Sequence, residues 1–244
     1  MHRFFVSPDC IDRNSVVITG GQAHQLKEVL RLKAGNRVVI LDNTGSEYQV
    51  KLVDITHDKA LAEVIERHQC INEPRLEITL HQALLKSSKF DLVLQKCTEI
   101  GVTEFRPVLC QRCVSSHPSE SRLNRWQRII VEAAEQSRRG KIPNIHPVVS
   151  FERACEEARG LSLLPWEGQG ITNIRAALRN LLSDDGNRKL NIFVGPEGGF
   201  SSYEVEFART RGIVPVTLGK RILRSETAAM VAATIVLYQY GELD

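Results

Sequence analysis

The most informative segment of the chain reads Ile192-Phe193-Val194-Gly195-Pro196-Glu197-Gly198-Gly199-Phe200-Ser201-Ser202-Tyr203-Glu204. It begins as an apolar run typical of a buried strand, passes through a glycine turn and continues into a helix. Ser201 and Glu204 have the spacing of a capping box, which marks the start of that helix. Gly198 and Gly199 permit positive φ angles and a close approach of the backbone to a ligand. The segment predicts a ligand-binding loop or, more simply, a tight turn between two elements.

A second junction of this kind lies nearer the end of the sequence. It reads Leu218-Gly219-Lys220-Arg221-Ile222-Leu223-Arg224-Ser225-Glu226-Thr227-Ala228, so a strand meets a glycine and three cations fall within five residues. Ser225 is expected to cap the helix that follows, and Glu226 then lies in its first turn, where the helix dipole favours a carboxylate. A weaker third junction is Leu163-Leu164-Pro165-Trp166-Glu167-Gly168. Together the strand ends predict one shared pocket, although ordinary surface charge also explains the arginines.

Strand and helix patterns alternate from residue 76 onward. Ser88 and Asp91 are placed to cap a helix that ends at Gly101, and residues 123–134 repeat apolar side chains at helical spacing. Apolar runs typical of strands occur at residues 76–84, 105–109, 145–149, 161–165, 190–194 and 214–218. This alternation predicts an α/β fold with a mainly parallel sheet, in which ligands gather at the carboxyl ends of strands. Neither G-x-G-x-x-G nor G-x-x-x-x-G-K-[ST] occurs, which excludes the common dinucleotide and P-loop sites.

The first 72 residues have a different pattern. Short strands are expected at residues 38–41, 48–53 and 60–65, with one helix opened by Gly20-Gly21 and closed by Gly35. Several short strands with a single helix predict a small β-barrel. Residues 69–74 interrupt the pattern as a linker. The expected domains are therefore residues 1–72 and 73–244.

Composition excludes several classes of protein. The 244 residues are 42% hydrophobic and 25% charged, which is ordinary for globular chains and excludes extended disorder. The longest apolar run covers 11 residues, 228–238, whereas a membrane span needs about 20. The first eight residues lack the apolar core of a signal peptide. We therefore expect a soluble cytoplasmic protein with no membrane partner, in which the six cysteines are thiols.

Charge and cysteine spacing indicate partners only weakly. The net charge is +3, but residues 106–141 hold eight basic and three acidic residues. That surplus suits either a phosphate backbone or a solvated helix face. Cys110, Cys113 and His117 have the C-x2-C-x3-H spacing of half a zinc site. Because no second C-x-x-C is present, we expect no metal.

The glycine junctions are similar to those of the bacterial 16S ribosomal RNA uracil-N3 methyltransferase family, within the SPOUT superfamily. Supporting segments are His24 with Val29-Leu30-Arg31, Gln95-Lys96-Cys97-Thr98-Glu99-Ile100-Gly101 and Glu132-Ala133-Ala134-Glu135-Gln136-Ser137-Arg138-Arg139. The resemblance covers essentially the whole chain. It implies an N-terminal PUA-like barrel that helps to hold RNA and a C-terminal α/β domain tied in a deep trefoil knot.

The resemblance also implies the ligands. S-adenosylmethionine would lie bent in the knot, and the partner would be 16S rRNA, within the 30S subunit. The protein would be a homodimer in contact through the final helix, with Ala228, Ala229, Ala232 and Ala233 at the interface. The implied cofactor-binding residues are Pro165, Gly195, Pro196, Glu197, Gly198, Gly199, Leu218, Gly219, Arg221, Ile222 and Leu223.

Methylation of uridine at N3 has chemical requirements of its own. N3 is a poor nucleophile until its proton leaves, so an enzyme needs a proton acceptor and positive charge near the two flanking carbonyl oxygens. We expect Arg224 to stabilise the deprotonated uracil and Glu226 to orient the site or take the proton. Arg139, at the end of the basic helix, is expected to reach the same site across a dimer interface. The sulfonium supplies the electrophile, so the reaction needs no metal.

Two other classes of function stay open. One is a non-catalytic RNA-binding or ribosome-assembly factor that keeps the pocket for structure, which binding of S-adenosylmethionine without turnover would favour. The other is a knotted methyltransferase that acts on transfer RNA or on a ribose hydroxyl. The identity of the product nucleoside distinguishes that enzyme from a uridine N3 methyltransferase.

Overall fold

The structure is a computed structural model that describes residues 1–115, 117–168, 172–179 and 189–243. The chain divides into two compact units. The first contains Met1–Glu73 and Ala134–Ile142, and the second contains Pro74–Ala133 and Pro143–Asp244. The division expected from the sequence, between residues 72 and 73, does not anticipate that Ala134–Ile142 groups with the first unit.

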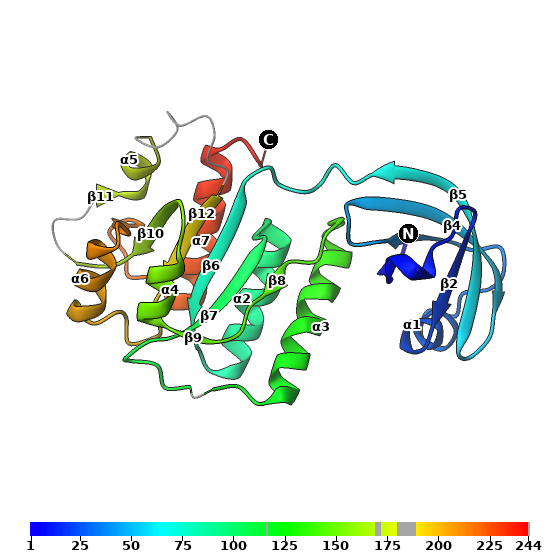
Figure 1. Ribbon diagram of the computed structural model, residues 1–244, viewed down its shortest axis with the longest axis horizontal. Helices are drawn as coiled ribbons and strands as arrows, with labels where there is room; N and C mark the ends of the chain where they lie inside the picture. The colour runs from blue at the N-terminus through cyan, green and yellow to red at the C-terminus, as the bar shows by residue number, and fades with distance from the viewer. Residues whose placement is uncertain (116, 169–171, 180–188, 244) are drawn as a thin grey trace. The chain divides into compact units, whose positions relative to one another are not determined.

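One five-stranded sheet forms the frame of the first unit (Figure 1). In spatial order its strands are β1 (Arg3–Phe5), β3 (Arg37–Leu41), β4 (Ser46–Ile55), β5 (Lys59–Gln69) and β2 (Ser15–Thr19). β1 runs parallel to β3, and the other pairs are antiparallel. The register between β4 and β5 shifts at Gln49/Val50 and again at Leu52/Asp54. Such irregularities bend and twist a ladder, so the sheet curls around its core.

Alternating residues of these strands face that core. Val38 and Ile40 of β3 are fully buried, and so are Val50 and Leu52 of β4, which is the period expected of half-buried strands. The three strands expected at residues 38–41, 48–53 and 60–65 lie within β3, β4 and β5. Alternation of apolar and polar residues was therefore sufficient to locate these three strands.

The helix of the first unit is shorter than expected. α1 (Gly21–His24) continues as a π-helical stretch, η2 (Gln25–Val29), and a 3-10 turn, η1 (Pro8–Cys10), precedes β2. The helix ends before Arg31, whose φ of 52° is incompatible with a right-handed helix. The N–H of Leu32 then bonds back to the carbonyl of Leu26, a fully buried side chain. The positive φ of Arg31 and this hydrogen bond close the helix, so Gly35 is not its cap.

Glu73 holds Ala134–Ile142 in the first unit. Its carboxylate accepts hydrogen bonds from the Arg139 guanidinium at 2.9 Å and from the backbone N–H groups of Gly140 and Lys141 at 2.8 and 3.1 Å. The Asn72 amide donates to the carbonyl of Arg138 at 3.0 Å. Residues 69–74, which were expected to be a linker, therefore bind residues 138–141 through hydrogen bonds.

The second unit is built on an eight-stranded sheet in which every pair is parallel. Its spatial order is β11 (Thr172–Asn173), β13 (Val214–Thr217), β10 (Leu161–Pro165), β12 (Lys189–Val194), β6 (Glu77–Ala83), β7 (Glu104–Leu109) and β8 (Asn144–Ile145), with β9 (Val149–Ser150) also on β7. The single strand expected at residues 145–149 is wrong. It is divided into β8 and β9, and Pro147, which has no N–H to donate to the ladder, lies between them.

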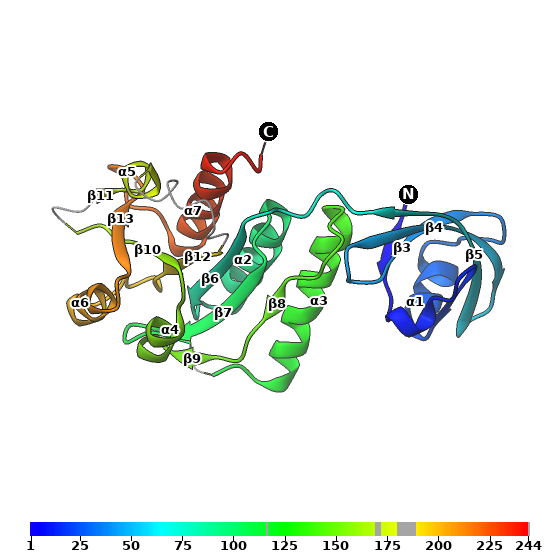
Figure 2. The same cartoon turned by 45° about the horizontal axis from the view of Figure 1, so that its top comes forward.

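Helices cover both faces of this sheet (Figures 1 and 2). They are α2 (Ser87–Ile100), α3 (Glu120–Gln136), α4 (Phe151–Glu157), α5 (Ile174–Arg179), α6 (Ser202–Thr210) and α7 (Ser225–Gln239). His81 of β6 stacks on Phe193, in the core that α4 and α6 cover, whereas its neighbour Gln82 bonds to Ser225 of α7. Successive residues of a strand face opposite sides, so α7 and its neighbour α2 lie opposite α4 and α6. Across the described residues, no helix combines the length and apolarity needed to cross a bilayer.

The predicted helix starts are right where the cap is local and wrong where a tertiary partner competes. At α6, the capping box is confirmed, because Ser201 and Glu204 exchange hydrogen bonds of 3.2 and 2.8 Å. At α2, the N-cap is Lys86 and not Ser88, and Asp91 pairs with Arg125 at 2.8 Å. At α7, the N-cap is Arg224 and not Ser225.

The strand order sets the path of the chain near its end. β10 lies between β12 and β13, and α7 packs on β12 and β6, so the chain must return past β10 after β13. Residues 218–224 make this return along the carboxyl ends of the strands. The predicted α/β class with a parallel sheet is confirmed, whereas the trefoil knot stays a prediction of the resemblance.

Candidate active site

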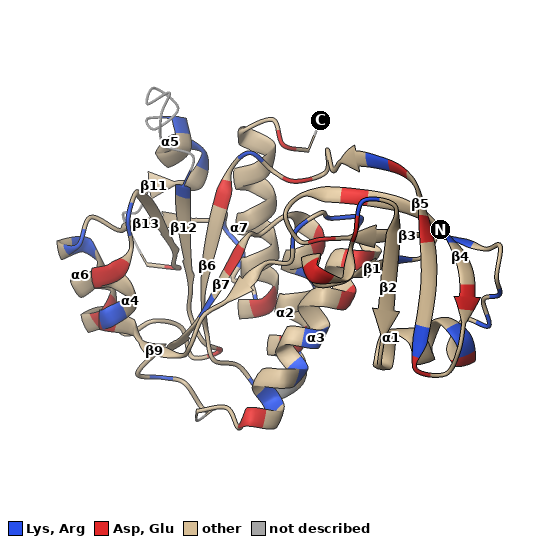
Figure 3. Ribbon diagram, turned by 45° about the vertical axis from the view of Figure 1, so that its right-hand side comes forward, with Lys and Arg blue, Asp and Glu red and all other residues tan. Residues whose placement is uncertain are grey.

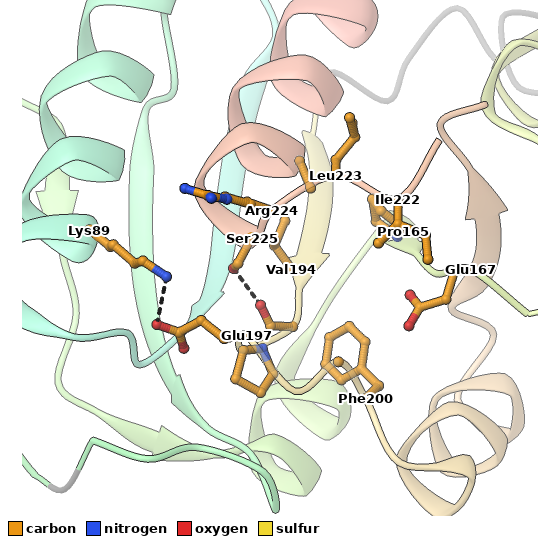
Figure 4. Close-up of a pocket in the computed structure, with 14 residues that line it drawn as sticks. Lys89, Pro165, Glu167, Val194, Glu197, Phe200, Ile222, Leu223, Arg224 and Ser225 are labelled. Atoms are coloured by element: carbon orange, nitrogen blue, oxygen red, sulfur yellow. Dashed lines mark hydrogen bonds and ion pairs between the residues drawn. The ribbon is translucent and has the colours of Figure 1, made fainter. Parts of the chain in front are cut away.

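Three chain segments at the carboxyl edge of the parallel sheet enclose a cavity of about 460 Å³ (Figure 4). They follow β10, β12 and β13. The predicted cofactor residues that line the cavity are Pro165, Gly195, Pro196, Glu197, Gly199, Ile222 and Leu223. An adjoining hollow of about 70 Å³ adds Leu218, Gly219 and Arg221. The structure therefore brings ten of the eleven predicted residues together, and Gly198 is the exception.

Gly198 packs against Arg112 instead. A Cβ on Gly198 would lie 3.2 Å from the Arg112 Cβ, and the Arg112 guanidinium donates to the carbonyls of Gly198 at 2.9 Å and Phe200 at 3.4 Å. The preceding residue, Gln111, also contacts the segment after β12, because its N–H donates to the Glu204 carboxylate at 2.8 Å. The turn after β7 thus supports the glycine loop, a role that the sequence did not indicate.

Of Gly198 and Gly199, the two glycines expected to permit positive φ angles, only Gly199 adopts one, and Gly195 is also sterically confined. Gly199 has a φ of 67°, and its N–H closes a tight turn onto the carbonyl of Pro196 at 2.9 Å. A Cβ at Gly199 would lie 3.2 Å from a carboxylate oxygen of Glu167, and one at Gly195 would lie 3.1 Å from the ring of Phe200. A side chain at either position would push into a cavity wall.

Ser225 connects two of the three segments. Its hydroxyl donates to the carbonyl of Gly195 and accepts a hydrogen bond of 3.0 Å from the Gln82 amide. All three residues come from different elements of the chain, namely β6, the loop after β12 and the start of α7. This explains why Ser225 does not cap α7, since its hydroxyl is already committed to the glycine loop.

Two cations and two carboxylates give the cavity its electrostatic character. Lys89 of α2 and Glu197 lie 3.2 Å apart and are both about one-third exposed. Figure 4 shows Lys89 and Arg224 on the side of the cavity near Glu197, with Glu167 on the opposite side. Burial raises the pKa of Glu197, but hydrogen bonds from its own N–H and from Lys89 outweigh this, and the net shift is downward. Glu197 is therefore ionised at neutral pH.

Sequence reasoning missed Lys89 and Glu167 as cavity residues. Lys89 could have been identified only from its position in the sequence. It lies in the first turn of the helix that follows β6, at the same sheet edge as the glycine loops. Glu167 was part of the third strand end, which is weak on its own.

The three predicted catalytic residues have different surroundings. Arg224 lines the cavity. Glu226 does not line the cavity; its side chain is buried, and its Oε2 has no hydrogen-bond partner among the described residues. Arg139 is buried in the first unit, where it pairs with Glu73 at 2.9 Å. A catalytic role for Arg139 stays a prediction and requires this ion pair to open.

Cys110 and Cys113 form a hydrogen-bonded turn at the end of β7. The N–H of Cys110 donates to the Cys113 sulfur at 3.3 Å, and the hydrogen bond from the Cys110 thiol lowers the pKa of Cys113 to about 7. The same interaction, with burial, raises the pKa of Cys110. Within the described part of the chain, no group of three His, Cys, Asp or Glu side chains is arranged to hold a metal ion.

Most of the basic side chains in residues 106–141 form ion pairs or hydrogen bonds with other residues of this chain. Arg106 pairs with Glu157, Arg122 donates to the carbonyl of Leu85, and Arg125 pairs with Asp91. Arg112 and Arg139 have the partners given above. Figure 3 shows basic and acidic positions interspersed along the ribbon of α3. This segment is therefore weak evidence for a phosphate-binding face.

Comparison with known proteins identifies the family. Residues 72–237 match the RNA methyltransferase domain family, and residues 18–65 match the RNA methyltransferase PUA domain family. Ribosomal RNA small subunit methyltransferase E of Synechocystis is 37% identical over 95% of this chain and 75% of its own length. The chain belongs to the ribosomal RNA small subunit methyltransferase E family. The corresponding protein of Mesomycoplasma hyopneumoniae is 34% identical over 96% of this chain and 98% of its own.

A solved structure of this methyltransferase E family has the same fold as this chain over nearly its whole length. The crystal structure of ribosomal RNA small subunit methyltransferase E from Neisseria gonorrhoeae, bound to S-adenosyl methionine, has a TM-score of 0.86 with this chain. The two are 30% identical, and the match covers 98% of each chain. The expected PUA-like character of the first unit and the membership of this methyltransferase family are thereby confirmed.

Proposed function

We propose that this chain transfers a methyl group from S-adenosylmethionine to N3 of a uridine in 16S rRNA of the small ribosomal subunit. The observation that carries the proposal is the cavity, which three glycine- or proline-containing strand ends enclose and which Arg224 lines on the side of Lys89. The family and its relatives' names support an RNA substrate in the small subunit, and the Neisseria structure supports the methyl donor.

The residues of the cavity fit S-adenosylmethionine. A volume of about 460 Å³ suits a molecule of this size. Glu167 and Glu197 offer negative charge to a ligand that carries a sulfonium and an ammonium group. Ile222 and Leu223 offer apolar contact to a flat base, and Ile222 is 82% exposed although it is a large aliphatic residue. Gly195 and Gly199 both line the cavity and carry no side chain that would occupy it.

The chain's own residues then have distinct roles. When bound, S-adenosylmethionine supplies an electrophilic methyl group, so that the N3–CH3 bond forms as the CH3–S bond breaks and the electron pair stays on sulfur. The N3 proton leaves to a carboxylate of the cavity wall, Glu167 or Glu197. Arg224 stabilises the negative charge on the uracil oxygens. Glu226, which lies outside the cavity wall, is proposed to orient the start of α7 rather than to accept the proton.

We also propose that the protein acts as a homodimer. α7 is apolar around its whole circumference, a property of helices that are buried on all sides. Ala229, Ala232 and Ala233 are already buried inside this chain, so they cannot form the interface as the resemblance implied. Tyr238 of α7 is 68% exposed and is the residue that we propose to lie at the interface. A Tyr238→Glu variant that stays dimeric in sedimentation analysis would contradict this interface.

The reaction is tested by methyl transfer from labelled S-adenosylmethionine to 30S subunits from cells that lack this protein. Digested nucleosides are identified by mass spectrometry. We expect 3-methyluridine with the wild-type protein, and a loss of about 100-fold or more in rate with Arg224→Ala, as for removal of one group that stabilises a developing anion. A different methylated nucleoside would contradict the uridine assignment, and cofactor binding without any product would indicate a binding factor.

A further inference from the structure

Lys89 is the second positively charged side chain on the cavity wall, among the residues that the structure describes there. It comes from the first turn of α2, whereas Arg224 precedes α7. The two elements pack against each other on the same face of the sheet. Two cations from separate elements therefore reach one cavity.

The ion pair of Lys89 with Glu197 leaves the ammonium available. The Nζ···Oε1 distance is 3.2 Å, and 33% of the Lys89 side chain and 27% of the Glu197 side chain are exposed. Partly exposed pairs of this kind contribute little net stability. An ammonium group has three donors, so Lys89 can keep one hydrogen bond to Glu197 and give another to a substrate oxygen.

The chemistry of the uracil imide explains why two cations are useful. When N3 loses its proton, the negative charge spreads to the carbonyl oxygens on both sides of N3. A single guanidinium can face only one of these oxygens closely, because N3 itself must remain open to the methyl group. A second cation on another element can face the other oxygen and lower the barrier further.

We propose that Lys89 is a second catalytic residue, whose ammonium stabilises one carbonyl oxygen of the deprotonated uracil while Arg224 stabilises the other. This inference rests on the proposed function, since it requires a uridine N3 anion. Glu197 holds the ammonium at the wall in the absence of substrate, and its carboxylate is ionised at neutral pH.

The test compares three variants with the wild type on 30S subunits. Lys89→Met removes the charge and keeps the length of the side chain, and Lys89→Arg restores a cation. Lys96→Met is the matched control, because Lys96 lies on the same helix and pairs with Glu99 at 2.8 Å outside the cavity. For each variant, kcat, KM, the thermal unfolding midpoint and the Kd for S-adenosylmethionine by calorimetry are measured.

We expect Lys89→Met to lower kcat about 100-fold, with the Kd for S-adenosylmethionine within about twofold of wild type. Lys89→Arg should recover at least about tenfold of the lost rate, and Lys96→Met should match the wild type. Formation of 3-methyluridine by Lys89→Met at the wild-type rate would overturn this inference alone. A loss of cofactor affinity as large as the loss of rate would overturn it too, since Lys89 would then bind the cofactor. A product other than 3-methyluridine would overturn the proposed function itself, whatever the effect of Lys89.

Discussion

The hydroxyl of Ser225 donates a hydrogen bond to the carbonyl of Gly195, and so joins the start of α7 to the glycine loop after β12. The same hydroxyl accepts from Gln82, a buried side chain whose Oε1 has no hydrogen-bond partner among the described residues. Ser225 thereby fixes the relative position of two walls of the cavity. Loss of this hydroxyl should lower both the stability of the fold and the affinity for a ligand in the cavity.

Ser225→Ala should lower the free energy of unfolding by about 1–2 kcal/mol, because Gln82 and Gly195 each lose a buried partner. Chemical denaturation followed by circular dichroism measures this change. The Kd for S-adenosylmethionine should rise about tenfold as the glycine loop loosens. Ser225→Thr, which keeps the hydroxyl, is the control, and an unaltered Kd in Ser225→Ala would contradict the positioning role.

Gly199→Ala should weaken cofactor binding through both strain and obstruction. Gly199 has a φ of 67°, and a new Cβ would lie 3.2 Å from the Glu167 carboxylate on the cavity wall. Gly212→Ala is a matched control, since Gly212 has a φ of 76° and open space around it. Both variants should lose about 1–2 kcal/mol of stability from the positive φ. Calorimetry should show a higher Kd for S-adenosylmethionine only in Gly199→Ala, and equal affinities in the two variants would be the contrary result.

His81 should make the protein less stable as the pH falls from about 6.5 to about 4. Burial lowers the pKa of His81 from 6.5 to about 4, against the opposing effect of its hydrogen bond with Asn191. Between these values the unfolded chain binds a proton that the folded chain does not, so stability is complete above the upper value and declines below it. The decline should reach about 2 kcal/mol near pH 5.

The measurement for His81 is urea unfolding at several pH values, compared with His81→Gln. A glutamine amide can still donate to Asn191, but it has no proton to gain in this range. The variant should therefore show a flatter pH dependence than the wild type. Parallel curves for the two proteins would rule out His81 as the source.

Cys113 should react with iodoacetamide at neutral pH much faster than Cys97 or Cys155. The pKa of Cys113 is lowered to about 7, whereas burial raises the pKa of Cys97 and of Cys155 to about 12. Because the thiolate is the nucleophile, only Cys113 of these three has a substantial reactive fraction at pH 7. Peptide mapping by mass spectrometry after brief labelling checks this order, and early labelling of Cys97 in the folded protein would contradict it.

The local parts of the site were predictable from sequence, and the parts that depend on tertiary contacts were not. The glycine turn at Gly199 and the capping box of Ser201 follow from short-range backbone chemistry, and both occur as expected. The roles of Lys89 and Ser225 depend on which strands become neighbours, about which residue spacing carries no information. The ion pair of Arg139 was not predictable for the same reason, because its partner Glu73 is distant in sequence. Pro147 was available as a signal that the strand at residues 145–149 is interrupted, but the apolar pattern outweighed it.

The order of the strands also determines when the cavity can first exist. Its walls come from the ends of β10 and β12 and from residues 222–228, and the last of these is added only after β13 has paired beyond β10. A nascent chain that has emerged as far as α6 has the glycine loop after β12 but neither Arg224 nor the hydroxyl of Ser225 to hold it. Binding of a small molecule in this cavity therefore reports that α7 has docked. In a chain of this topology, the complete binding site exists only once α7 is in place.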